Sequence, residues 1–174
     1  GNDPAPFVRA LSGNDPRSLS AAIRAQIATG SRQLGYDPTQ MRFSEVDEDA
    51  IDLVAIMLQT LAHNHAGVQR ARTMYGRLVV PYLKLALSDN TLFEGRDHPG
   101  RRLLEALSDA CDGNIGDTPQ DQQTLTHAEL AVDRVVDGYR EDQAIFELAA
   151  AELRDHLEQQ KRMRDVAEQR ASEA

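Results

Sequence analysis

The 174-residue sequence predicts an all-α protein, a helical bundle of about five helices. Apolar residues recur at helical spacing along the chain, and no stretch shows the period-two alternation of a half-buried strand. Hydrophobic residues make up 41% and charged residues 27%, so the chain can bury a core. Clusters of Gly, Pro, Asn and Asp divide it into segments of helical length.

Residues 1–16 carry Gly-Asn-Asp-Pro twice, a composition typical of turns, and we expect a flexible N-terminal arm there. A first helix is predicted from about Ser18 to Leu34, with Ile23, Ile27 and Leu34 on one face. A turn through Pro38 follows this helix.

A second helix is predicted after Ser44, which can serve as its N-cap. Four acids then fall where the helix dipole favours negative charge; they are Glu45, Asp47, Glu48 and Asp49. Ile51, Val54, Leu58 and Leu61 fall at helical spacing, and Leu53, Ile56 and Met57 widen this apolar face. A face so broad is expected to pack against more than one neighbour, and the helix is expected to end near residues 63–65.

The third predicted helix, from about Ala66 to Ser88, is apolar on nearly every side in its second half. We expect such a helix at the centre of a bundle. Pro81 removes one backbone hydrogen bond and predicts a kink or restart after Gly76. A strand is the alternative here, because Val79 and Val80 favour it.

Lys84 is the one charged residue in that apolar half, so we expect a buried structural charge whose ammonium meets an acid such as Asp89. The alternative is a desolvated, reactive amine with a lowered pKa.

A fourth helix is predicted to begin at Pro99, where proline loses no hydrogen bond, and residues 112–121 are expected to form a loop. Thr126 and Glu129 form a capping box that predicts a last helix running to about Glu168. Such a helix would span roughly 65 Å. It therefore breaks, for instance at Gly138, or projects beyond the body; we expect projection.

These elements suggest three parts: a flexible arm over residues 1–16, a helical bundle domain over residues 17–157 and a polar helical extension over residues 158–174.

An anion-binding site is a hypothesis for the start of the fourth helix. Helix N-termini attract anions, and four cationic side chains gather here: Arg96, His98, Arg101 and Arg102. In the alternative interpretation, Asp97 or His98 caps the helix and the arginines pair with some of the 28 acidic residues.

The last helix carries an apolar stripe at heptad spacing, formed by Phe146, Ala150, Leu153 and Leu157. This stripe is either an interaction seam for a protein partner or for self-association, or it folds back onto the chain's own bundle. Both alternatives remain open at this stage.

No catalytic motif, cofactor fingerprint or metal-ligand spacing is present in the sequence. His63 and His65 cannot share one helix face, so together with His98 they do not indicate a metal site. Cys111 has no neighbouring base and is expected to be a structural thiol. We therefore expect a protein that is not an enzyme and needs no cofactor.

The formal net charge of −9 argues against nucleic acid or an anionic membrane as partner, because both require a dense basic surface. No apolar run reaches the length of a membrane-spanning helix, and the single cysteine cannot form an internal disulfide. A soluble, cytoplasmic location is expected.

Three segments carry a family resemblance: SEVDEDAIDLVAIML at Ser44–Leu58, RLVVPYLKLALSD at Arg77–Asp89 and HPGRRLLEALSDA at His98–Ala110. They resemble the large bacterial proteins of domain-of-unknown-function family 1631: the last two segments in order and approximate spacing, and the first in its acid-rich start before Asp-Leu-Val. The resemblance covers about residues 18–157. It departs from the family pattern at Val80 and Gly100.

This resemblance implies an internal fragment of a longer bacterial protein, and it supplies no catalytic residues. The favoured hypothesis is a non-catalytic helical scaffold or regulatory protein-interaction module. The alternative is a sensor that binds an anionic metabolite or nucleotide at residues 98–102.

Overall fold

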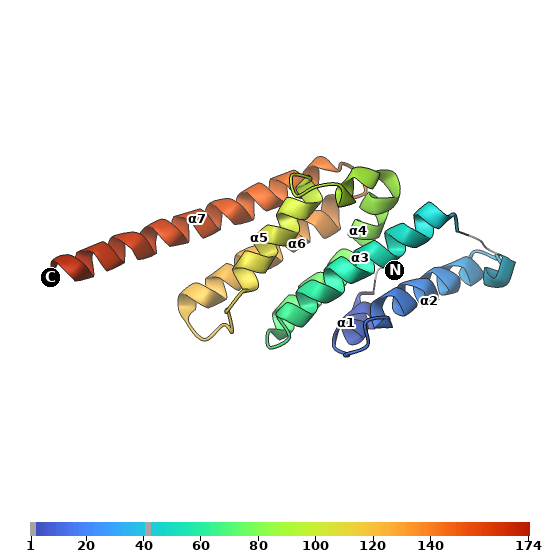
Figure 1. Cartoon of the computed structure of the whole chain (residues 1–174), viewed down its shortest axis with the longest axis horizontal. Helices are drawn as coiled ribbons and strands as arrows, with labels where there is room; N and C mark the ends of the chain where they lie inside the picture. The colour runs from blue at the N-terminus through green and yellow to red at the C-terminus, as the bar shows by residue number, and fades with distance from the viewer. Residues whose placement is uncertain (1–2, 41–42) are drawn as a thin grey trace. The chain divides into compact units, whose positions relative to one another are not determined.

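The computed structural model describes residues 3–40 and 43–174. Within these residues the chain is all-α, with no strand, as predicted. The elements are α1 (Ala5–Leu11), α2 (Ser18–Gln33), η1 (Pro38–Gln40), α3 (Glu45–Asn64), α4 (Gln69–Ser88), η2 (Asn90–Phe93), α5 (Pro99–Cys111), α6 (Pro119–Gly138) and α7 (Ala144–Glu173) (Figure 1).

The contacts of the chain divide it into two compact units. Unit 1 comprises residues 1–95 with α1 to α4 and both 3₁₀ helices, and unit 2 comprises residues 96–174 with α5, α6 and α7. The division falls inside residues 17–157, which we predicted to form one bundle domain. It coincides with the short connector that contains Gly95, between η2 and α5.

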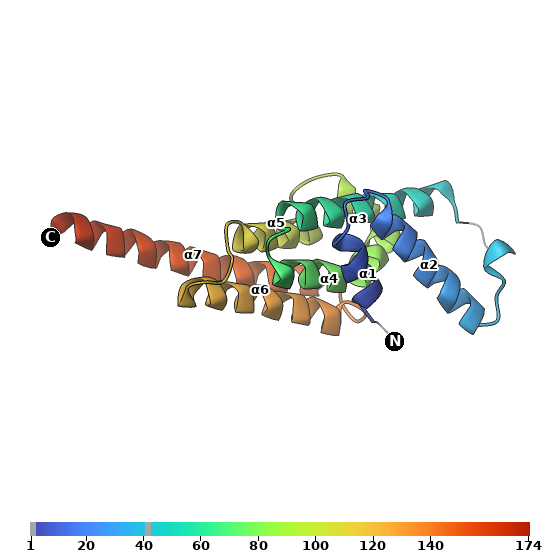
Figure 2. The same ribbon diagram turned by 90° about the horizontal axis from the view of Figure 1, so that it is seen from below.

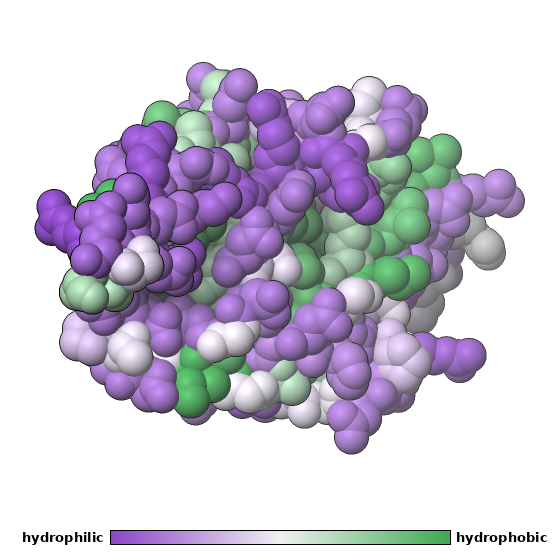
Figure 3. All heavy atoms as spheres, turned by 60° about the vertical axis from the view of Figure 1, so that its left-hand side comes forward, coloured by the Kyte–Doolittle hydropathy of each residue, from purple (hydrophilic) through white to green (hydrophobic). Residues whose placement is uncertain are grey.

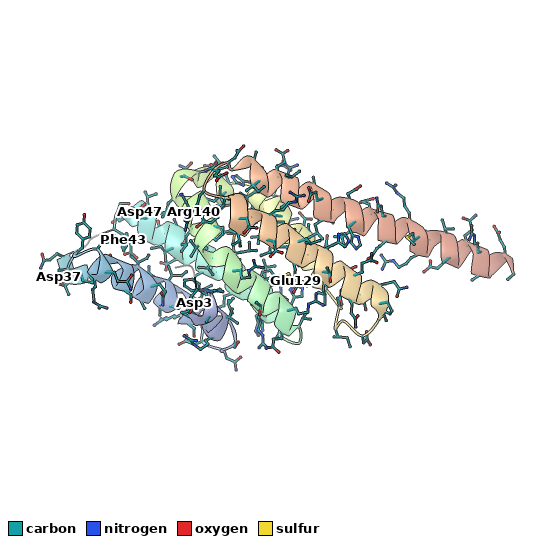
Figure 4. All side chains as sticks on the ribbon, turned by 180° about the vertical axis from the view of Figure 1, so that it is seen from behind. Asp3, Asp37, Phe43, Asp47, Glu129 and Arg140 are labelled. Atoms are coloured by element: carbon teal, nitrogen blue, oxygen red, sulfur yellow. The ribbon has the colours of Figure 1, made fainter. Side chains whose placement is uncertain are left out.

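In unit 1, α3 begins where the sequence predicts. The Ser44 hydroxyl accepts a hydrogen bond from the Asp47 backbone N–H at 3.1 Å, which satisfies one of the free amides of the first turn. Phe43 lies just before this turn and Asp47 within it (Figure 4). Further along α3, the side chains of Ile51, Val54 and Leu58 are buried.

Helix α4 is the most buried helix of unit 1, with ten buried residues, and it packs against α1, α3 and η2. Two of the largest fully buried side chains of the chain, Tyr75 and Tyr82, belong to it. The helix runs without interruption through Pro81, so the expected restart and the strand alternative are both wrong. Burial on several sides stabilises the helix against the lost hydrogen bond.

The expected flexible arm is a packed helix over residues 5–11. Phe7 and Leu11 of α1 are buried, and α1 packs against α2 and α4. The close approach depends on Gly76 of α4, since a Cβ built on Gly76 would lie 2.5 Å from Val8 Cγ2. The sequence indicated at most one short amphipathic turn in this arm, through Phe7, Val8 and Leu11, because only the tertiary contact stabilises so short a helix.

Unit 2 consists of three helices that pack side by side. Ion pairs from Arg102 to Glu147 and from Arg154 to Asp109 align α5 and α7 in parallel, because both pairs span the same number of residues. Contacts from Gln160 to the Gln120 carbonyl and from Arg134 to Glu152 align α6 and α7 antiparallel (Figure 2).

The long last helix is interrupted after Gly138, so the expected continuous helix from Thr126 is wrong. The chain reverses through residues 139–143, and a Cβ on Gly138 would lie 3.1 Å from Ile145 Cγ1, a close approach within the reversal. Arg140, just past α6, holds its guanidinium carbon 5.6 Å from the centroid of the Tyr139 ring (Figure 4). The reversal lets the apolar stripes of α6 and α7 bury each other, which a straight helix could not achieve.

Helix α7 nevertheless extends past its partners. Gln160 contacts the start of α6, and every residue from 161 to 174 is exposed. Figures 1 and 2 both show this last part of α7 running beyond the ends of α5 and α6. This segment contains most of the extension expected at residues 158–174.

The N-cap of α6 is Thr118, not Thr126 as the capping box predicted. The Thr118 hydroxyl accepts from the Asp121 backbone N–H at 3.1 Å, and Pro119 occupies the first helical position. Thr126 lies inside the helix, where its hydroxyl donates to the Gln122 carbonyl at 3.0 Å.

We therefore expect Thr118→Ala to lower the free energy of unfolding by about 1 kcal/mol, the usual cost of losing an N-cap. Thr126→Ala should change it by less than half as much, because alanine is the better helix former. Urea denaturation of both variants measures the difference. An equal loss in the two would contradict the assignment of the cap.

Candidate functional site

The start of α5 contains the four predicted anion-binding residues, and the structure assigns one of them to capping. His98 Nδ1 accepts a hydrogen bond from the Gly100 backbone N–H at 3.0 Å. An amide that an anion would use is therefore already bonded to the chain's own side chain. Arg96 is exposed and Arg101 half-buried.

Arg102, the fourth residue of this group, points along α5 toward α7. Its Nη2 lies 3.6 Å from Glu147 Oε1, and both side chains are about half exposed. The structure thus agrees with the alternative interpretation at two of the four residues: histidine caps and arginine pairs with an acid. Anion binding here stays a prediction.

A surface hollow of about 350 Å³ brings Arg102 together with the predicted seam residue Ala150. Glu105, Glu147 and Arg154 line the same hollow. Two arginines thus face two glutamates, and Arg154 also binds Asp109 at 2.8 Å. This balance of charges gives an incoming anion little net attraction.

The predicted interaction seam lies mostly inside unit 2. Phe146, Ala150 and Leu153 are buried, and Leu157 is half-buried. Because α7 packs against both α5 and α6, these side chains form an internal seam. Of the two alternatives left open by the sequence, folding back is the one observed. Phe146 and Leu153 are inaccessible to a partner, and Ala150, although buried, borders the surface hollow.

Lys84 is exposed, so the buried charge expected at this position is wrong. The residue shares one stripe of α4 with Val80, which is half-buried, and Leu87, which is exposed. Because Val80 and Leu87 are apolar, the sequence pattern did not indicate that this side of the helix faces solvent.

The histidines considered for a metal lie in separate environments. His65 is buried with its Nδ1 3.1 Å from the Tyr75 hydroxyl, His98 caps α5, and His63 is exposed. Across residues 3–40 and 43–174, no three His, Cys, Asp or Glu side chains are grouped as metal ligands. Cys111 is buried.

A stacked histidine pair between α6 and α7 was missed by the sequence analysis. The rings of His127 and His156 lie 3.8 Å apart, with 12° between their planes. Thr124 Oγ1 lies 3.4 Å from His156 Nε2 and donates to Gln160 Oε1 at 2.5 Å. The pair lies 29 residues apart in sequence, so only the reversal after Gly138 brings it together.

Burial and, next, the charge of His127 lower the pKa of His156 from its ordinary value of 6.5. The folded chain then binds a proton at His156 less readily than the unfolded chain does. Neutral His156 therefore contributes to the stability of the folded chain. This contribution is fully present above pH 6.5 and is lost as the pH falls below it.

We expect the urea concentration at the unfolding midpoint to decrease when the pH is lowered from 7.5 to 5.5. The decrease should be smaller in His156→Gln. The exposed His63→Gln variant is the matched control and should keep the wild-type dependence. Identical pH profiles in all three proteins would refute a role for the stacked pair.

Since its described residues form helices and no strands, the chain belongs to the class of all-α proteins. The family model described as "Protein of unknown function (DUF1631) 2nd domain" matches residues 6–142, and the chain belongs to this family. The expected family is confirmed, although the match begins and ends earlier than residues 18–157. No curated protein and no solved structure matches the chain.

The matched residues cover α1 to α6 and stop before α7. The family description gives no activity to carry over to particular residues. Within the described part of the chain, no helix has both the length and the apolarity to cross a membrane.

Proposed function

We propose that this chain is a non-catalytic helical interaction module of a larger bacterial cytoplasmic protein, and that α3 presents its docking face. The observation that carries the proposal is a stripe of exposed apolar side chains on α3. Val46, Leu53 and Ile56 are 68%, 40% and 60% exposed. We call these three residues the α3 stripe.

The spacing of the α3 stripe argues against a chance distribution. Steps of seven and three residues place the three side chains on one side of the helix, opposite the buried Ile51 and Leu58. Single exposed apolar residues are normal, whereas a group on one face is typical of an interaction site. The face shown in Figure 3 is mostly hydrophilic, with separate apolar patches.

The charges around the α3 stripe indicate the chemistry of the partner. Asp49 lies one turn from both Val46 and Leu53, and Glu45 flanks the stripe; both acids are exposed. Their neighbours Glu48 and Asp52 are held by Arg24 at 2.5 and 3.1 Å. An apolar helix face with a basic residue near Asp49 would complement this surface.

Self-association or partner binding through the C-terminal helix also remains a proposal, now confined to its exposed end. Met163 and Val166 are the large apolar side chains there, and Lys161, Arg162 and Arg164 surround them. This segment offers a smaller apolar surface than the α3 stripe does, so α3 is the favoured face.

The proposal is tested by placing a photoreactive amino acid at position 53 in cells that express the protein. A light-dependent adduct with another polypeptide is expected at position 53 and not at the exposed, polar position Gln26 of α2. Adding Ile56→Glu to the first protein should abolish the adduct by placing a charge in the apolar contact. Equal adducts at both positions, or none at either, would contradict the proposal.

A further inference from the structure

A pocket of about 300 Å³ lies in unit 1, where the turn after α1 covers the second half of α3 and the start of α4. Its size is at the lower end of small-ligand pockets. Leu11, Pro16, Ile56 and Ala62 supply apolar lining, and His63 and Arg72 also face it.

The charge of this pocket is opposite to that of the chain. Among the described residues, His63 and Arg72 are the only ionisable ones that line it, and no Asp or Glu does, although acids outnumber bases in the sequence by 28 to 19. Arg72 is half-buried, and its side chain has no ion pair or hydrogen bond with the described residues. A guanidinium in this position is available to an anion, which it can bind through two parallel hydrogen bonds.

The wall of the pocket is held in place by Gln59. Its Nε2 donates to the Asp15 carbonyl at 2.6 Å and so ties α3 to the turn after α1. Its Oε1 is buried and accepts no hydrogen bond from the described residues. The Asp15 contact is therefore the bond that orients the amide and holds this wall of the pocket.

We propose that this pocket binds a carboxylate carried on a short aliphatic body. Arg72 and His63 contact the carboxylate, and Leu11 and Ile56 contact the aliphatic part. The site is separate from the helix start at residues 98–102 and goes beyond the proposed interaction function. Two sources share this chemistry: a free aliphatic acid and the C-terminal residue of a peptide.

The test is an NMR titration of the whole chain with butyrate, and with butylammonium and butanol at the same concentrations. We expect saturable shifts of the Ala62 and Ala66 methyl signals and of the Arg72 side-chain signal with butyrate alone. Equal shifts with butylammonium or butanol, or no shift with butyrate, would overturn a carboxylate site.

Two variants of lining residues test whether butyrate binds in the pocket, and a third variant outside it is the control. Arg72→Gln should weaken butyrate binding at least tenfold, while Arg9→Gln removes an exposed positive charge outside the pocket and should leave binding unchanged. Ala66→Glu places an acid at an exposed lining position and should abolish binding without unfolding the chain. Unchanged binding in Arg72→Gln and Ala66→Glu would overturn the proposal.

The dipeptide acetyl-Gly-Leu and its C-terminal amide distinguish the two sources. Tighter binding of the free-acid dipeptide than of butyrate assigns the pocket to a peptide C-terminus, and the reverse order assigns it to a free acid. Either order supports the carboxylate site. Ile56 belongs to both surfaces, whereas Arg72 and Ala66 lie outside the α3 stripe and Leu53 lies outside the pocket. The variants at Arg72 and Ala66 therefore test the pocket alone and the cross-link at position 53 tests the docking face alone, so either proposal can fail without the other.

Discussion

A chain that ends after Asp142 is expected to lose the structure of unit 2, while a chain that ends after Gln160 keeps it. The first truncation removes all of α7, which buries Phe146, Ala149, Ala150 and Leu153 against α5 and α6. The second removes the part of α7 that lies beyond its last contact with α6.

The size of the effect follows from the buried area. Burying Phe146 and Leu153 contributes about 3–6 kcal/mol together, against a total stability of about 5–15 kcal/mol for a small domain. Removing α7 also exposes apolar surface of the two helices that it packs against, whose buried residues include Leu103 and Leu107 of α5 and Val132 and Val135 of α6. Two helices without a third cannot rebury them.

The measurement is the dispersion of backbone NMR signals from residues 96–142, together with helical content by circular dichroism. Collapsed dispersion is expected in the chain ending after Asp142 and native dispersion in the chain ending after Gln160. Native signals in both would show that α7 is dispensable. The result matters for the family, because its matched residues 6–142 contain only two of the three helices of unit 2.

The second large effect is expected at Gly76, where Gly76→Ala should destabilise the chain by about 1–3 kcal/mol. The added Cβ would lie 2.5 Å from Val8 Cγ2 and 3.2 Å from the Val8 backbone nitrogen. Backbone cannot yield as a flexible side chain can, so α1 must shift. The burial of Phe7 and Leu11 is then reduced.

Gly30→Ala is the matched control, since a Cβ at Gly30 of α2 meets nothing within 4 Å. Alanine should raise stability there by about 0.5–1 kcal/mol through helix propensity alone. The two substitutions therefore have opposite expected signs, with a melting temperature lowered by several degrees for Gly76→Ala. A stabilising Gly76→Ala would show that α1 is not packed against α4 in solution.

Much of the helical layout could be predicted from local sequence signals. Ser44 caps α3 and Pro99 opens α5 as expected, since both effects depend on residues within one turn. The start of α6 carried the same kind of signal, Thr118 before Pro119 with Asp121 two residues later, and could have been predicted. The Thr126–Glu129 pattern competed with it and misled the prediction.

The candidate sites were less predictable, because their properties depend on which helix faces meet. An apolar stripe at Phe146, Ala150 and Leu153 indicates burial but not whether the covering surface is internal or a partner. Exposure of Lys84 could not be read from a run whose other solvent-facing positions, Val80 and Leu87, are apolar too.

By itself the sequence determined that the chain is all-α, where most helices begin, and which family it belongs to. These properties depend on hydrogen bonds and residue patterns within a few turns. Only the tertiary structure decided that residues 5–11 pack, that the chain reverses after Gly138, and that His63 and Arg72 share a pocket which no acid in the described part of the chain lines. Those features depend on contacts between residues distant in sequence, where the size of one glycine can decide whether two helices meet.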